Sequence, residues 1–158
     1  MIKIIAVGKI KETYFTEAIA EYQKRLSAYT RLQILQVADE KCPEGMSPAM
    51  ALQVKAREGR RILDNINDKD YVITLEIKGR RFSSETFSEY LEMLRSTGHP
   101  DIAFVIGGSA GLADEVSRRS DLKISFSDMT FPHQLMRVIL LEQIYRSFKI
   151  ARNEPYHK

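Results

Sequence analysis

Residues 102–111, with the sequence IAFVIGGSAG, place five consecutive apolar residues directly before a glycine-rich turn. A segment that is apolar at every position is typical of a strand covered on both faces, as in the centre of a parallel α/β sheet. Ligands of open α/β sheets usually bind at the carboxyl ends of such strands. The glycines could serve only a tight strand-to-helix corner, but because they would also let a ligand approach the backbone closely, we favour a ligand-binding turn.

The turn itself does not identify the ligand. It lacks the Gly-Lys-Ser/Thr ending of a phosphate-binding P-loop, and it does not have the Gly-x-Gly-x-x-Gly spacing of the dinucleotide fingerprint. The pattern therefore predicts a site and leaves its chemistry open.

The remainder of the chain alternates strands and helices around this stretch. Alternation of this kind predicts an α/β fold with a mostly parallel, helix-flanked sheet of about five strands, in one domain over residues 1–158. Ser47 before Pro48, and Ser83 or Ser84, are typical helix caps. The other strands are expected at residues 2–7, 32–37, 71–77 and 122–126, and helices at about 13–29, from 48, from 84, at 112–118 and at 134–150.

Composition limits the class of protein. The chain has 158 residues, 44% of them hydrophobic and 28% charged, with a net charge of +3, which is ordinary for a globular protein. Its only cysteine, Cys42, excludes an internal disulfide and a cysteine-based metal site. No signal peptide and no apolar stretch of the roughly 18 residues needed for a membrane span is found. We therefore expect a cytoplasmic protein without a metal or a membrane partner.

A helix after Ser47 carries a basic group of four side chains. A charge-rich helix face is most simply a solvated one, and the alternative is a surface that contacts phosphates. The four residues are Lys55, Arg57, Arg60 and Arg61.

Two features near the carboxyl terminus stand out chemically. Arg137 falls on the apolar face of the last helix, where it must either reach water or meet a carboxylate or phosphate at a site or subunit interface. Residues 151–158 would ordinarily form a frayed end, yet Tyr156 and His157 can both hydrogen-bond a base or transfer a proton.

Several segments together resemble the RlmH family of bacterial ribosomal RNA methyltransferases. They are IGGSAGL at 106–112, SFSDMTFPHQLMRVILLEQIYRSFKI at 125–150, TLEIKGR at 74–80 and the ending NEPYHK. The similarity extends over essentially the whole chain. It implies a SPOUT-type fold with a deep trefoil knot near the carboxyl terminus, and S-adenosylmethionine as cofactor.

The same resemblance implies an activity and its partners. RlmH proteins transfer a methyl group to N3 of a pseudouridine in 23S rRNA of the assembled ribosome, as homodimers, with no DNA partner. Tyr156 and His157 are our candidates for holding the base and taking its proton in the partner subunit's pocket. Arg137 and Arg146 are candidates for contacting a phosphate or the cofactor carboxylate, and His133 for shaping the loop. The implied cofactor residues are Leu75, Gly107, Gly108, Phe126, Ser127, Asp128, Met129, Thr130 and Phe131.

Two alternatives belong to a different functional class. One is a non-catalytic module that senses a nucleotide through the glycine turn, and the other is a ribosome-associated protein that holds S-adenosylmethionine only structurally. Both would bind without turnover, so methyl transfer distinguishes them from an enzyme.

Overall fold

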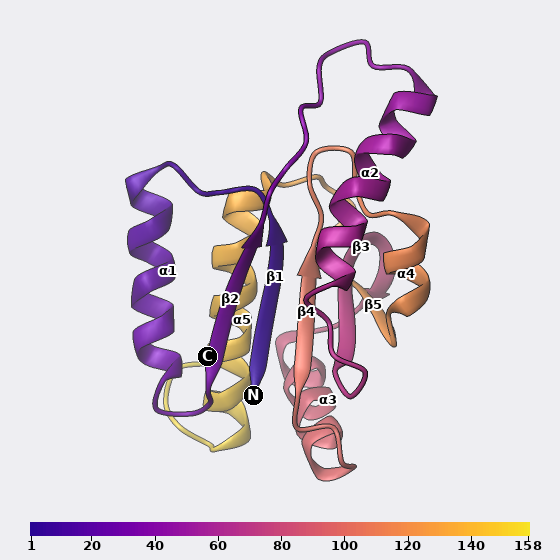
Figure 1. Cartoon of the computed structure of the whole chain (residues 1–158). Coiled ribbons are helices and arrows are strands. Elements are labelled where there is room, and N and C mark those ends of the chain that lie inside the picture. The colour runs from indigo at the N-terminus through magenta and orange to yellow at the C-terminus, as the bar shows by residue number, and fades with distance from the viewer.

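A computed structural model describes residues 1–158 and confirms the predicted α/β architecture. Five strands form one sheet in the order β2-β1-β4-β3-β5, with every neighbouring pair parallel (Figure 1). The trefoil knot remains a prediction from the resemblance. In chain order the elements are β1 (Ile2–Val7), α1 (Thr13–Leu26), β2 (Leu32–Val37), α2 (Pro48–Leu63), β3 (Tyr71–Arg81), α3 (Ser84–Ser96), β4 (Ile102–Ile106), α4 (Asp114–Arg119), β5 (Leu122–Ser125) and α5 (His133–Ala151).

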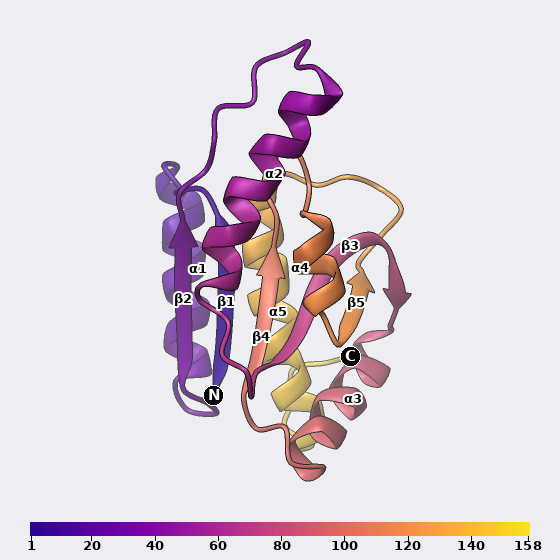
Figure 2. The ribbon, with the colours of Figure 1, turned by 45° about the vertical axis from the view of Figure 1, so that its right-hand side comes forward.

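Helices cover both faces of the sheet, so the molecule has three layers (Figure 2). The last helix, α5, packs between α1 and α3 on one face, while α2 and α4 lie on the other. None of the helices combines the length and apolar composition that crossing a membrane requires.

The central strand β4 is buried at every position, as its continuous apolar sequence predicts. Its side chains alternate between the two layers of the core. Phe104 and Ile106 pack on the side of α1, α3 and α5, and Ala103 and Val105 pack on the side of α2 and α4. Burial on both faces therefore explains why the strand has no polar position.

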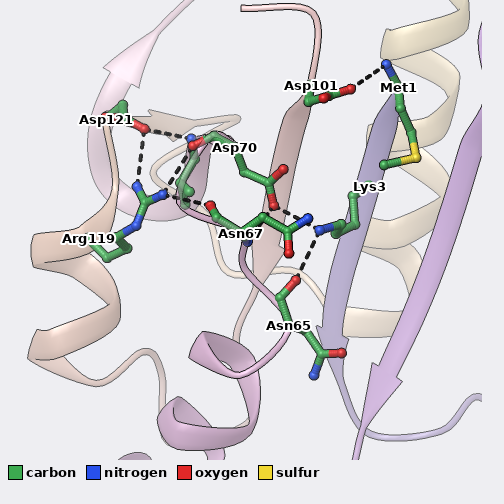
Figure 3. Close-up of polar contacts among 9 residues, drawn as sticks. Met1, Lys3, Asn65, Asn67, Asp70, Asp101, Arg119 and Asp121 are labelled. Carbon is green, nitrogen blue, oxygen red and sulfur yellow. Dashed lines mark hydrogen bonds and ion pairs between the residues drawn. The ribbon is translucent and has the colours of Figure 1, made fainter.

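A polar network holds the amino ends of the strands together (Figure 3). The Lys3 ammonium is 2.8 Å from the Asp70 carboxylate, and both side chains are almost fully buried. The terminal ammonium of Met1 donates to Asp101 at 3.0 Å. Asp121 accepts from the backbone N–H of Val72 at 2.7 Å. This edge of the sheet is thus occupied by structural contacts, and the opposite, carboxyl edge is free for a site.

Strand β3 is longer than predicted, because it bends and pairs twice with the same residue of β5. Leu75 lies opposite Ile124, and after a shift in register Arg80 lies opposite Ile124 again. Gly79 makes this close approach feasible, since a Cβ there would lie 2.6 Å from the Ile124 carbonyl carbon. The intervening residues 76–79 leave the ladder at the carboxyl edge of the sheet.

Candidate active site

A cavity of about 450 Å³ lies where β3, β4 and β5 end. Its walls come from three segments that are far apart in the sequence: the bend of β3, the glycine turn after β4, and the loop between β5 and α5. Three strand ends therefore meet at one site, as the parallel topology requires. The lining residues are Leu75, Glu76, Ile77, Lys78, Ile106, Gly107, Gly108, Ser109, Gly111, Leu112, Ile124, Ser125, Phe126, Ser127, Met129, Thr130, Phe131, His133 and Met136.

All the residues that the resemblance implies for the cofactor line this cavity, except Asp128. Asp128 is exposed and forms an ion pair with Arg81 at the end of β3. The Arg81 guanidinium holds the pKa of the Asp128 carboxyl below its usual value. Asp128 thus ties the loop to β3 and does not line the cavity.

The three glycines of the turn serve different purposes. Only Gly111 has a positive φ, of 87°, and its N–H donates to the Gly108 carbonyl at 3.0 Å to close the turn. Gly107 and Gly108 have ordinary backbone angles, but a Cβ would lie 3.0 Å from Leu112 at the first and 2.9 Å from Glu58 at the second. Close approach of other groups, rather than unusual φ, requires glycine at these two positions.

A neutral histidine lies at the edge of the cavity. His133 Nε2 is 3.3 Å from Ser109 Oγ, so the start of α5 contacts the glycine turn. Burial lowers the pKa of His133, and the positive charge of Arg137 lowers it further. The imidazole is therefore uncharged at neutral pH and can accept a proton or a hydrogen bond.

Two carboxylates near the glycine turn and the cavity were not predicted from sequence. Glu76 lines the cavity, and hydroxyl groups of Thr74 and Ser117 donate to it at 2.8 and 3.0 Å. A carboxylate inside the mostly apolar segment 71–77 was a usable signal for it. Glu58, beside Gly108, carried no such signal because it lies in a charge-rich helix.

Arg137 does not have the surroundings expected for it. The side chain is only 2% exposed, and its Nη2 donates to the carbonyl oxygens of Val7 and Gly8 at 2.7 and 2.8 Å. The prediction that it reaches water is thus wrong, and within this chain it meets carbonyl oxygens; contact with a carboxylate or phosphate of a ligand stays a prediction. Arg137 points toward β1, so its position no longer supports a subunit interface along α5.

The tail after α5 is packed against the chain and is not a frayed end. Tyr156 donates to Glu142 at 3.0 Å, and His157 Nε2 is 2.8 Å from a Glu85 oxygen. Arg146 Nη1 is 3.1 Å from His157 Nδ1. Because a guanidinium can only donate, Nδ1 accepts this bond and Nε2–H donates to Glu85. Arg146, Tyr156 and His157 form one group, but none of them lines the cavity of their own chain.

Three of the four basic side chains on α2 form ion pairs, with two acidic neighbours between them. Arg57 and Arg61 both pair with Glu40, at 3.7 and 2.5 Å, and Arg60 pairs with Asp64 at 3.6 Å. Lys55 has no ion pair and lies next to the glycine turn, 3.9 Å from where a Cβ on Gly111 would stand. Of the four, Lys55 is the best placed to meet a phosphate near the cavity.

Comparison with known proteins identifies the family. The family model described as "Predicted SPOUT methyltransferase" matches residues 1–157. The chain belongs to the SPOUT methyltransferase family. Among curated relatives, proteins named "Ribosomal RNA large subunit methyltransferase H" are 55% identical in Lactobacillus delbrueckii subsp. bulgaricus, 54% in Enterococcus faecalis and 56% in Bacillus cytotoxicus, each over 157 residues that cover 99% of both chains.

A solved structure supports the SPOUT fold at lower similarity. The probable methylase family protein from Haemophilus influenzae Rd KW20 matches 99% of this chain and 70% of its own, with a TM-score of 0.53 at 14% identity. Within the SPOUT chain described here, no group of three or more His, Cys, Asp or Glu side chains is placed to hold a metal ion.

Proposed function

We propose that this protein is an S-adenosylmethionine-dependent methyltransferase that acts on N3 of a pseudouridine in 23S rRNA of the assembled ribosome, in the cytoplasm and as a homodimer. The observation that carries the proposal is the cavity where β3, β4 and β5 end, in a chain 55% identical to proteins named ribosomal RNA large subunit methyltransferase H.

The residues of the cavity suit an adenosyl cofactor. Leu75, Phe126 and Phe131 offer apolar surface for a flat base, and the backbone of residues 126–131 offers amides and carbonyls that can recognise its edge. Gly107 and Gly108 leave room that a Cβ would fill. When bound, S-adenosylmethionine supplies a methyl group on a positively charged sulfur. The exposed side chains of Ile77 and Met129 at the rim would shield it from water once RNA is bound.

The reaction needs alignment and a proton acceptor. The ring nitrogen must stand about 3–3.5 Å behind the methyl carbon, and its proton must leave. Burial raises the pKa of Tyr156, so its phenol remains protonated and is suited to hold the base by donating a hydrogen bond. His157 can take the proton at Nδ1 once Arg146 releases that nitrogen.

The position of the tail supports the homodimer. If Tyr156 and His157 contact the substrate, a second copy of the chain must bring them to the cavity, since they do not line the cavity of their own chain. We infer that each site combines the cavity of one subunit with the tail of its partner.

The test is transfer of a labelled methyl group from S-adenosylmethionine to ribosomes that lack the modification, with naked rRNA as the comparison. Label on N3 of one pseudouridine, and only with ribosomes, is the expected result. Cofactor binding without any label would instead favour a non-catalytic module.

A further inference from the structure

A second cavity, of about 250 Å³, adjoins the first across the glycine turn. It lies between the ends of β1 and β4, where the chain connections leave the sheet in opposite directions, and such switch points are preferred ligand sites. The two cavities share Gly108, Ser109 and His133. The second cavity is lined by Val7, Gly8, Lys9, Asp39, Glu40, Glu58, Gly108, Ser109, Pro132, His133, Gln134 and Arg137.

Glu58 presents an unsatisfied carboxylate oxygen in this cavity. The residue is only 3% exposed. Its Oε1 accepts from the backbone N–H of Glu40 at 3.0 Å, whereas its buried Oε2 has no hydrogen-bond partner. Oε2 lies beside the glycine turn, 2.9 Å from where a Cβ on Gly108 would stand. Buried polar groups are normally paired, so this oxygen indicates a missing donor.

Arg137 supplies the opposite charge to the same cavity. Its Nη2 is fixed by the carbonyls of Val7 and Gly8, while its buried Nε has no partner. Lys9 adds a second cation to the lining, and Asp39 and Glu40 add two further carboxylates. A simple cation would meet Arg137 and Lys9, and a simple anion would meet the carboxylates. A ligand that carries both charges suits this lining best.

We propose that the second cavity binds the zwitterionic amino-acid end of the cofactor, with Glu58 accepting from its ammonium group and Arg137 facing its carboxylate. This inference rests on the proposed function, because the nucleoside part of the same molecule would occupy the first cavity. The shared turn at Gly108 connects the two parts, and glycine there leaves the passage open. Glu58 is then a cofactor-binding residue that belongs to neither the glycine turn nor the loop 126–131.

Calorimetric titration with two ligands tests the assignment. S-adenosylhomocysteine carries the amino-acid end, and 5′-methylthioadenosine lacks it. Glu58→Gln should weaken binding of S-adenosylhomocysteine by about tenfold or more and leave binding of methylthioadenosine unchanged. Asp64→Asn, an exposed carboxylate at the end of the same helix, is the matched control and should alter neither affinity.

A third ligand tests the inference in the unaltered protein. An analogue of S-adenosylhomocysteine without its amino group should bind the wild-type chain about as weakly as Glu58→Gln binds the parent compound. Equal losses for S-adenosylhomocysteine and methylthioadenosine, or no loss for either, would overturn the inference. If the wild-type chain binds neither nucleoside, the proposed function itself fails and the inference falls with it.

Discussion

At the scale of single residues, Glu58 has surroundings that cost stability in the absence of a ligand. Burial raises the pKa of its carboxyl group, and the negative charges of Asp39 and Glu40 act in the same direction, while the Glu40 N–H and Arg61 oppose them. Lys9, His133 and Arg137 face the same cavity from β1 and α5. A ligand with an ammonium group would remove this cost, as is usual where a site is built at the expense of stability.

The pH dependence of stability follows from this raised pKa. The folded state binds more protons than the unfolded state between the ordinary and the raised pKa, so stability falls as pH rises through that interval. Glu58→Gln should therefore raise the melting temperature at pH 7 by about 1–3 °C, and the difference should vanish near pH 4. Thermal unfolding of the wild-type and Glu58→Gln proteins from about pH 4 to pH 7 checks this prediction. A lower melting temperature for Glu58→Gln at pH 7 would contradict the argument.

The buried pair of Lys3 and Asp70 gives a prediction of the opposite kind. Lys3→Met leaves the Asp70 carboxylate buried without its cation, so the free energy of unfolding should fall by about 3–5 kcal/mol. Replacing Asp70 by Asn in the same protein should recover part of the loss. Urea unfolding measures both, and a loss below about 1 kcal/mol would mean that the pair behaves like an exposed one. Affinity for S-adenosylhomocysteine should not change, because the pair lies at the opposite edge of the sheet.

Single residues were predicted best where their role is local. Ser47 and Ser83 cap their helices as expected, accepting from the backbone N–H groups of Met50 and Thr86. Arg137 and Glu58 were not predictable, since their partners come from β1 and from the loop after β2, distant in sequence. The local sequence pattern predicts the backbone conformation of the helix or strand that contains a residue. The partner of a buried charge depends instead on how the helices and strands pack against one another.

At the scale of elements, the bend of β3 joins the fold to the site. Gly79→Ala would place a Cβ 2.6 Å from the Ile124 backbone and push β3 away from β5, just where residues 75–78 line the first cavity. We expect a loss of about 1–3 kcal/mol in stability together with weaker binding of S-adenosylhomocysteine. Thermal unfolding and calorimetric titration measure the two effects.

Gly98→Ala is the matched control for this variant. Gly98 has a φ of 94° and follows α3 at the amino edge, with open space around it. Alanine there should lower stability through backbone strain alone and leave ligand affinity intact. If both variants weaken binding in proportion to their loss of stability, the bend has no particular role in the site.

Most elements could be predicted from sequence, because their apolar periodicity is strong. The strands of residues 2–7, 32–37 and 102–106 have the expected bounds. The extension of β3 to Arg81 could not be predicted, since residues 78–81 are polar and pair only through the shift in register with β5. The helix after the glycine turn begins at Asp114 rather than 112, because Leu112 serves to pack against Gly107.

At the scale of the whole molecule, a shared site predicts complementation between defective subunits. Gly108→Val should block the cavity and His157→Ala should remove the tail function, so each variant alone should be inactive in methyl transfer. Equal amounts that exchange subunits should recover about a quarter of wild-type activity, since half of the dimers are mixed and each mixed dimer holds one intact site. No recovery, despite demonstrated exchange, would show that each chain works with its own tail.

Binding to the ribosome should depend on two basic residues of α2: Lys55, which has no ion pair, and Arg60, whose exposed side chain makes only a 3.6 Å contact with Asp64. The double variant Lys55→Glu with Arg60→Glu should bind ribosomes about tenfold more weakly at 0.1 M salt and show a smaller salt dependence. Lys24→Glu, on the opposite layer in α1, is the control. Sedimentation with ribosomes measures the affinities, and unaltered binding by the double variant would return α2 to the role of a solvated face.

The position of the first strand has a consequence for translation. β1 lies between β2 and β4, so its pairing is finished only after residues 102–106 have been made. α5, which covers the sheet between α1 and α3, comes last (Figure 1). Contacts so distant in sequence form slowly. A nascent chain that ends before residue 133 therefore exposes one apolar face and lacks part of the cavity wall, and ligand binding must await synthesis of almost the entire chain.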